Sequence, residues 1–192
     1  DKTHRIIALT EKLVKFLNLD KKEAEIAMEA AALCKADLAT KMVVEMTSLQ
    51  GVIGRYYAQW SGRSEEVARA IEEHYYPRFA GDKSPGSMAA LTVGLADRLD
   101  SLTGLFAAGM APSGTKDPFG LRRAAIGLVQ NLINWNLDFD LRWALSSAAE
   151  LQPIQPSEQV LDACFNFIAG RFENLLLEEL RRQGLILQHY RI

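Results

Sequence analysis

Apolar residues recur at helical spacing along almost the whole chain. The clearest case lies over residues 89–106, where Leu91, Leu95, Leu99, Leu102 and Phe106 follow at steps of four, four, three and four. Similar patterns predict helices over 3–18, 22–37, 38–47, 64–76, 118–134, 135–151 and 157–183. No stretch shows the alternation of apolar and polar residues that is typical of a β-strand. The sequence therefore predicts an all-α, non-bundle helical fold with a C-terminal helical extension.

Helix-capping residues and a proline-containing linker divide the chain into three parts. Asp20 and Ser64 stand where helix N-caps are expected. The proline-containing linker QPIQPS predicts a helical domain over 1–151 and a C-terminal extension over 152–184, with Gly184 ending its helix. Residues 185–192 stay unassigned. The chain begins with Asp1 and enters a helical pattern at once, so we expect a piece of a longer protein.

Composition narrows the classes of function. The chain is 48% hydrophobic and 24% charged with a formal net charge of −2, so any nucleic-acid contact must come from a local patch. The two cysteines, Cys34 and Cys164, lie far apart, which argues against a disulfide framework or a cysteine zinc site and indicates a reducing compartment. No apolar run reaches the ~20 residues that span a bilayer, so no membrane is expected as a partner.

The helix over 89–106 carries two carboxylates on an otherwise apolar or small surface. Such a helix is normally buried, and an unpaired buried charge is costly. Asp97 and Asp100 therefore either line a polar cleft or pair with basic groups.

A charged loop and helix start follow that helix. Asp117 is expected to cap the helix over 118–134, with Pro118 in its first turn. Arg122 and Arg123 then lie near the positive end of the helix dipole, which indicates an anionic partner. Two partners fit equally well: one of the acids of the preceding helix, or an RNA phosphate.

The residue types of common catalytic sites are sparse. There are three histidines, none at a metal-binding spacing such as HExxH, and no GxSxG elbow or phosphate loop is present. His74, which follows Glu72 and Glu73, is the most site-like of them. A structural histidine at the end of a helix is favoured over a metal ligand.

LADRLD at residues 95–100 resembles the closing motif of the HD superfamily of helical, metal-dependent phosphohydrolases. By that resemblance Asp97 matches a metal-ligand aspartate, and His74 loosely matches a histidine of the middle motif. The adjacent His-Asp pair of the family is absent from the corresponding stretch, AALCKADL. The resemblance implies a degenerate HD-like domain in which Asp97, Asp100 and His74 form a vestigial site or polar core, without a metal.

Four ordered blocks resemble the β subunits of bacterial-type heterotetrameric glycyl-tRNA synthetases. They are CKADLATKMVVEMTSLQGVIGRYYA (34–58), EEHYYPRFAGD (72–82), LADRLDSLTGLFAAG (95–109) and PSGTKDPFGLRRAA (112–125). The resemblance implies an internal, non-catalytic domain that binds and positions tRNA. Its partners would be tRNA(Gly), the α subunit and the rest of the β subunit. This fragment would hold no cofactor, whereas the whole enzyme uses ATP. The location would be the bacterial cytoplasm, or a plastid or mitochondrion in plants.

RNA binding needs cations for phosphates and aromatic rings for unstacked bases. The candidates are Arg55, Tyr56, Lys116, Arg122 and Arg123, and Lys35 with Lys41 forms a second basic pair. Two alternatives stay open. One is a metal-dependent HD-type phosphohydrolase with an unusual ligand set, and the other is a subunit-interface module.

Overall fold

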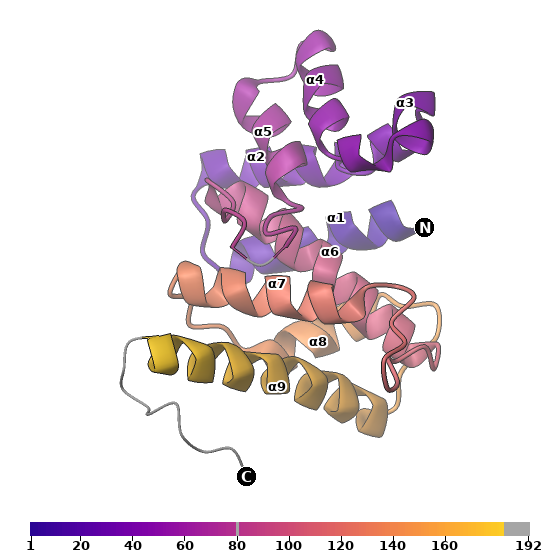
Figure 1. The fold of residues 1–192 in the computed structure, drawn as a ribbon. Coiled ribbons are helices and arrows are strands. Elements are labelled where there is room, and N and C mark those ends of the chain that lie inside the picture. Colours follow the sequence, from indigo (N-terminus) through magenta and orange to yellow (C-terminus); the bar gives the residue numbers. More distant parts are fainter. Residues whose placement is uncertain (80, 183–192) are drawn as a thin grey trace.

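The computed structural model describes residues 1–79 and 81–182, and these residues form helices joined by loops (Figure 1). The predicted all-α class is confirmed, because the described residues hold no strand beyond an isolated bridge between Ser113 and Lys116. The predicted helix end at Gly184 and the unassigned tail lie outside the described residues. The helices are α1 (Lys2–Phe16), α2 (Lys21–Leu33), α3 (Lys41–Glu45), α4 (Val52–Trp60), α5 (Glu65–Glu73), α6 (Met88–Ala107), α7 (Leu121–Asn134), α8 (Leu141–Ala149) and α9 (Glu158–Arg182).

Helix α6 runs through the middle of the fold. It packs against α1, α2 and α5 on one side and against α7, α8 and α9 on the other (Figure 1). Leu91, Leu95 and Leu99 are fully buried, and each stabilises the fold by about 1.5–3 kcal/mol relative to an exposed leucine. The hydroxyl of Ser87 accepts from the Ala90 N–H at 3.1 Å and so starts the helix. The apolar sequence of α6 thus explains its central place.

The beginning of the C-terminal helix belongs to the same core. Cys164 and Ile168 of α9 are buried in the main hydrophobic cluster. The rings of Phe106 on α6 and Phe167 on α9 lie 5.3 Å apart. The predicted extension therefore packs onto the helices that precede the proline linker.

The predicted caps at Asp20 and Ser64 are confirmed. The Asp20 carboxylate accepts from the Glu23 N–H at 2.9 Å, and the Ser64 hydroxyl accepts from the Val67 N–H at 3.2 Å. Each satisfies a backbone donor that the first turn of a helix leaves unpaired.

Two predicted helices, 22–37 and 64–76, are shorter in the structure and end at Leu33 and Glu73. Two others are interrupted. The 38–47 stretch is broken into 3-10 turns at Ala36–Ala39 and Thr47–Leu49 around the short α3, because Thr40 adopts an extended backbone and caps α3. The 135–151 stretch is helical only in α8. Asn136 has a φ of 48° there, and Asp140 caps the helix.

The start of α7 also differs from the prediction. The helix begins at Leu121 after Gly120, whose φ is +67°, so Pro118 lies in the loop and not in the first turn. Asp117 is nevertheless the capping carboxylate. Its oxygens accept from the N–H groups of Leu121 at 2.8 Å and Arg122 at 2.9 Å. The loop conformation at Gly120 moves the helix start while the capping residue is unchanged.

Within the part of the chain that the structure describes, no helix is long and apolar enough to cross a membrane.

Candidate functional site

A buried cluster of charged groups joins α1, α6 and the ends of α2 and α5. Lys35 Nζ lies 2.7 Å from Asp97 Oδ2 and 2.9 Å from His74 Nε2. Lys2 Nζ lies 2.9 Å from the other oxygen of Asp97. Asp97 is therefore held between two ammonium groups, and His74 shares one of them.

The protonation state of the cluster follows from its contacts. His74 Nδ1 lies 2.6 Å from the Ile71 carbonyl, so Nδ1 carries the hydrogen and donates, while Nε2 accepts from Lys35. Burial and the neighbouring Lys35 ammonium lower the pKa of His74 well below its usual range, so the ring is neutral. Burial raises the pKa of Asp97, but the charges of Lys35 and Lys2 outweigh it and hold that pKa below the usual carboxyl range.

Asp100 lies one turn along α6 and has its own partners. Its carboxylate accepts from Arg5 Nε at 2.6 Å, Lys2 Nζ at 3.0 Å and Gln152 Nε2 at 2.9 Å. Burial raises the pKa of Asp100, and the bonds from Arg5 and Lys2 lower it to a net value below the usual range. Of the two alternatives that the sequence leaves open for these acids, pairing with basic groups holds for both, and Asp97 also lines the cleft described below.

The predicted identity of those basic groups is wrong. Neither Arg122 nor Arg123 pairs with Asp97 or Asp100, which are occupied by Lys2, Lys35 and Arg5. Arg122 instead donates to the Gly114 carbonyl at 2.6 Å and to the Lys116 carbonyl at 3.4 Å. It therefore holds the loop before α7, and Arg123 is exposed beside it.

The cluster does not fit a metal ion. The two residues that the HD resemblance offers as ligands, His74 and Asp97, both contact the ammonium of Lys35. Among the residues that the structure describes, no group of three or more His, Cys, Asp or Glu side chains could hold a metal. A cation of the protein itself thus lies where those two ligands would meet, and a metal-bound water has no place between them.

Sequence reasoning missed Arg98, which is buried beside the cluster. Its guanidinium donates to the carbonyls of His74, Tyr75 and Tyr76, each at 2.9 Å. It also reaches the Gly94 carbonyl at 3.1 Å and the Pro77 carbonyl at 3.3 Å. Arg98 thus fixes the backbone of the segment that follows α5. Only the fold reveals this role, because backbone acceptors leave no sequence pattern.

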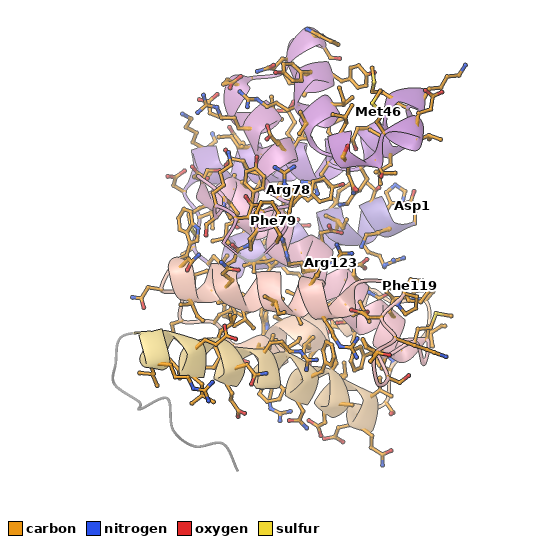
Figure 2. The ribbon with its side chains drawn as sticks, in the orientation of Figure 1. Asp1, Met46, Arg78, Phe79, Phe119 and Arg123 are labelled. Carbon is orange, nitrogen blue, oxygen red and sulfur yellow. The ribbon has the colours of Figure 1, made fainter. Side chains whose placement is uncertain are left out.

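A solvent-open cleft of about 420 Å³ lies next to this segment. Its walls come from the turn at 47–50, the segment after α5, α6 and the start of α7, and they include Tyr75, Arg78, Asp97, Arg98, Phe119 and Arg123. Figure 2 shows Arg78, Phe79, Phe119 and Arg123 on one face of the molecule. Three guanidinium groups and two aromatic rings therefore surround one hollow, and the charge of its carboxylate is already compensated.

The structure separates the predicted RNA-binding residues into two groups. Lys116, Arg122 and Arg123 come together at the loop and start of α7, beside the cleft. Arg55 and Tyr56 lie on α4, at the end of the molecule away from α7 (Figure 1).

The two groups also differ in how free their cations are. Arg55 is occupied by Glu65 at 2.7 Å and Glu72 at 3.2 Å. Lys35, from the second basic pair, is buried against Asp97 and is not available to a ligand.

Two aromatic residues and one arginine of this face were not foreseen. Phe119 and Phe79 are 52% and 65% exposed, and Arg78 lies beside the latter. The sequence carries a signal for both rings, because each stands between cations in a stretch with proline and glycine, where a core residue is not expected. Phe119 lies in KDPFGLRR (116–123) and Phe79 in YPRFAGDK (76–83).

Comparison with known proteins places this chain among glycyl-tRNA synthetase sequences. The family model described as glycyl-tRNA synthetase beta subunit matches residues 1–187. The chain is 46% identical over 173 residues to a glycine–tRNA ligase beta subunit of Chromohalobacter salexigens, covering 90% of this chain and 25% of the relative. It is 41% identical over 191 residues to the beta subunit of Moorella thermoacetica, covering 96% and 28%.

A plant protein is also similar. The chain is 40% identical over 178 residues to the chloroplastic/mitochondrial glycine–tRNA ligase 2 of Arabidopsis thaliana, covering 93% of this chain and 17% of that protein. The chain spans about a quarter of the length of the bacterial relatives it matches. On the extent of these matches, the chain belongs to the glycyl-tRNA synthetase beta subunit family.

Proposed function

We propose that this chain is a non-catalytic domain that binds and positions tRNA within the β subunit of a glycine–tRNA ligase. The complete enzyme, with its α subunit, would join glycine to tRNA(Gly) with ATP, while this domain itself holds no cofactor. The enzyme would act in the bacterial cytoplasm, or in a plastid or mitochondrion if the protein comes from a plant. The observation that carries the proposal is the cleft lined by Arg78, Arg123 and Phe119.

The charge distribution supports RNA as the ligand. Phosphates are bound by Arg and Lys side chains, and a local patch suffices when the net charge of the chain is −2. Arg123 is exposed and, among the described residues, has no carboxylate within ion-pair distance. Lys116 is exposed on the adjoining loop. The cations that face solvent here are therefore available to phosphates.

The alternative, a metal-dependent phosphohydrolase, is less well supported. It needs a metal with several ligands, and Lys35 lies between His74 and Asp97 instead. We therefore assign no hydrolytic step to this chain, and the HD-like centre serves as a polar core beneath the cleft.

Titration of the 192-residue chain with labelled tRNA(Gly) tests the proposal. The affinity should decrease as the salt concentration rises from about 50 to about 200 mM, because phosphate contacts release counterions and are therefore salt-dependent. Arg123→Ala and Lys116→Ala should each weaken binding about fivefold, or roughly 1 kcal/mol, and reduce the salt slope by about 1. Fluorescence anisotropy measures both quantities.

The matched control is Lys21→Ala on α2, whose side chain is 91% exposed and lies outside the cleft. It should leave affinity and salt slope unchanged. Binding that does not respond to salt, or that all three substitutions weaken equally, would argue against the cleft and for a subunit-interface role.

A further inference from the structure

The volume of the cleft suits one nucleotide better than a double helix. Pockets for small ligands measure roughly 300–1,000 Å³, and the cleft holds about 420 Å³. A paired RNA helix keeps its bases stacked inside and is recognised by shape and backbone from outside. Only a base that has left the stack can enter a hollow of this size.

Two cations reach the cleft from different elements. Arg78 comes from the segment after α5 and Arg123 from α7, so a group bound in the cleft meets guanidinium charge from two parts of the chain. Arg78 also contacts Asp82, at 3.6 Å, and the ring of Tyr76, whose centre lies 4.8 Å from Cζ. The carboxylate in the wall, Asp97, is neutralised by Lys35 and Lys2. The cleft is therefore electrostatically suited to a phosphate.

The backbone at the start of α7 does not supply the anion site. Asp117 already accepts from the first N–H groups of that helix, those of Leu121 and Arg122. A phosphate would be repelled there by the Asp117 carboxylate. Phosphate binding is thereby left to the arginine side chains.

The aromatic wall offers a surface for a base. Phe119 is 52% exposed, although the loop that carries it is fixed by the capping bonds of Asp117. A ligand with a flat face would stack on this ring, since every base has a π-face.

We infer that the cleft takes one unpaired nucleotide, with its 5′-phosphate between Arg78 and Arg123 and its base on the ring of Phe119. The inference rests on the proposed function, because the nucleotide would be an unpaired nucleotide of the bound RNA. A free nucleoside monophosphate has the same chemistry, and the experiment distinguishes the two.

The test compares a labelled single-stranded RNA pentamer with a blunt-ended RNA duplex, each titrated with the 192-residue chain. Stacking of one base is expected to make Phe119→Ala weaken binding of the pentamer about five- to a hundredfold, while binding of the duplex stays unchanged. The matched control is Trp60→Ala, because Trp60 is 75% exposed on α4 outside the cleft. This substitution should affect neither RNA.

Adenosine 5′-monophosphate serves as the competitor. If the monophosphate displaces the pentamer weakly from the wild type and not from Phe119→Ala, the cleft binds a nucleotide of RNA. Displacement as effective as that by unlabelled pentamer overturns the RNA source in favour of a free nucleotide. Equal loss of pentamer and duplex binding in Phe119→Ala, or no loss of either, overturns the inference. Salt-dependent tRNA binding through Arg123 would then still stand by itself, so the two failures are distinguishable.

Discussion

Replacing Asp97 with alanine is expected to lower the free energy of unfolding by about 3–5 kcal/mol, because the substitution leaves a buried ammonium unpaired. The Lys35 side chain is 11% exposed and lies 2.7 Å from Asp97. Its other close partners are uncharged: the ring of His74, and the ring of Tyr75, whose centre lies 4.1 Å from Nζ. Urea denaturation monitored by circular dichroism measures the loss.

Two further variants separate the buried pair from ordinary surface effects. Asp162→Ala removes the partner of Arg142 at 2.6 Å in an exposed pair, which should cost less than about 1 kcal/mol. Lys35→Met combined with Asp97→Leu removes both charges and should recover much of the stability lost in the single variant. If Asp97→Ala costs no more than Asp162→Ala, the buried cluster does not stabilise the fold.

The same prediction has a pH signature. The folded pKa of Asp97 is depressed, so its stabilising contribution is present above the unfolded pKa of about 3.9 and is lost as the pH falls through the folded value. The stability difference between the wild type and Asp97→Ala should therefore be constant near neutral pH and shrink below about pH 4.

Replacing Arg98 with leucine is expected to cost about 3–4 kcal/mol, because it leaves buried carbonyls of the segment after α5 without donors. Arg98→Lys should recover less than half of this loss. A single ammonium on a flexible stem cannot reach the carbonyls of His74, Tyr75 and Tyr76, which the planar guanidinium serves together. Chemical denaturation measures the stability of both variants. A lysine variant as stable as the wild type would contradict this role.

Two glycines provide an independent check on the close packing around the Arg98 guanidinium. A Cβ at Gly127 of α7 would lie 2.9 Å from Arg98 Nε, and one at Gly94 of α6 would lie 2.7 Å from the His74 carbonyl. These contacts explain why both helices need glycine at their approach to Arg98. Gly127→Ala should therefore destabilise the chain in the presence of Arg98 and by less in Arg98→Leu, because the shorter leucine side chain has no atom at the position of Nε.

Much of the fold could be predicted from sequence because it depends on local patterns. The leucine spacing of α6 and the caps at Asp20 and Ser64 are properties of short segments, and the structure confirms them. The need of Asp97 and Asp100 for basic partners also follows from burial alone.

The identity of those partners could not be predicted. Lys2 and Lys35 lie 95 and 62 residues from their contacts on α6, and only the packing of α1 and α2 brings them there. Arg122 and Arg123 are nearer along the chain. The start of α7 directs them to the preceding loop and to the cleft.

The predicted RNA-binding residues show a second limit of sequence reasoning. Arg55 and Tyr56 form a basic and aromatic pair in the sequence, but the contact between α4 and α5 places Glu65 and Glu72 on Arg55. A cation that carboxylates of the fold already hold by close contacts is poorly available to a ligand. Arg123 has no such partner among the described residues, whereas Arg55 has two, at 2.7 and 3.2 Å.

Ultraviolet cross-linking of the 192-residue chain to tRNA(Gly), with the attached peptides identified by mass spectrometry, tests the central claim that the cleft is the RNA-binding face. The account predicts cross-links at Tyr75 or Phe119, which line the cleft, or at Phe79, which lies on the same face as Phe119 (Figure 2). Cross-links confined to Tyr56 and Trp60 on α4, with none from the cleft, would contradict it.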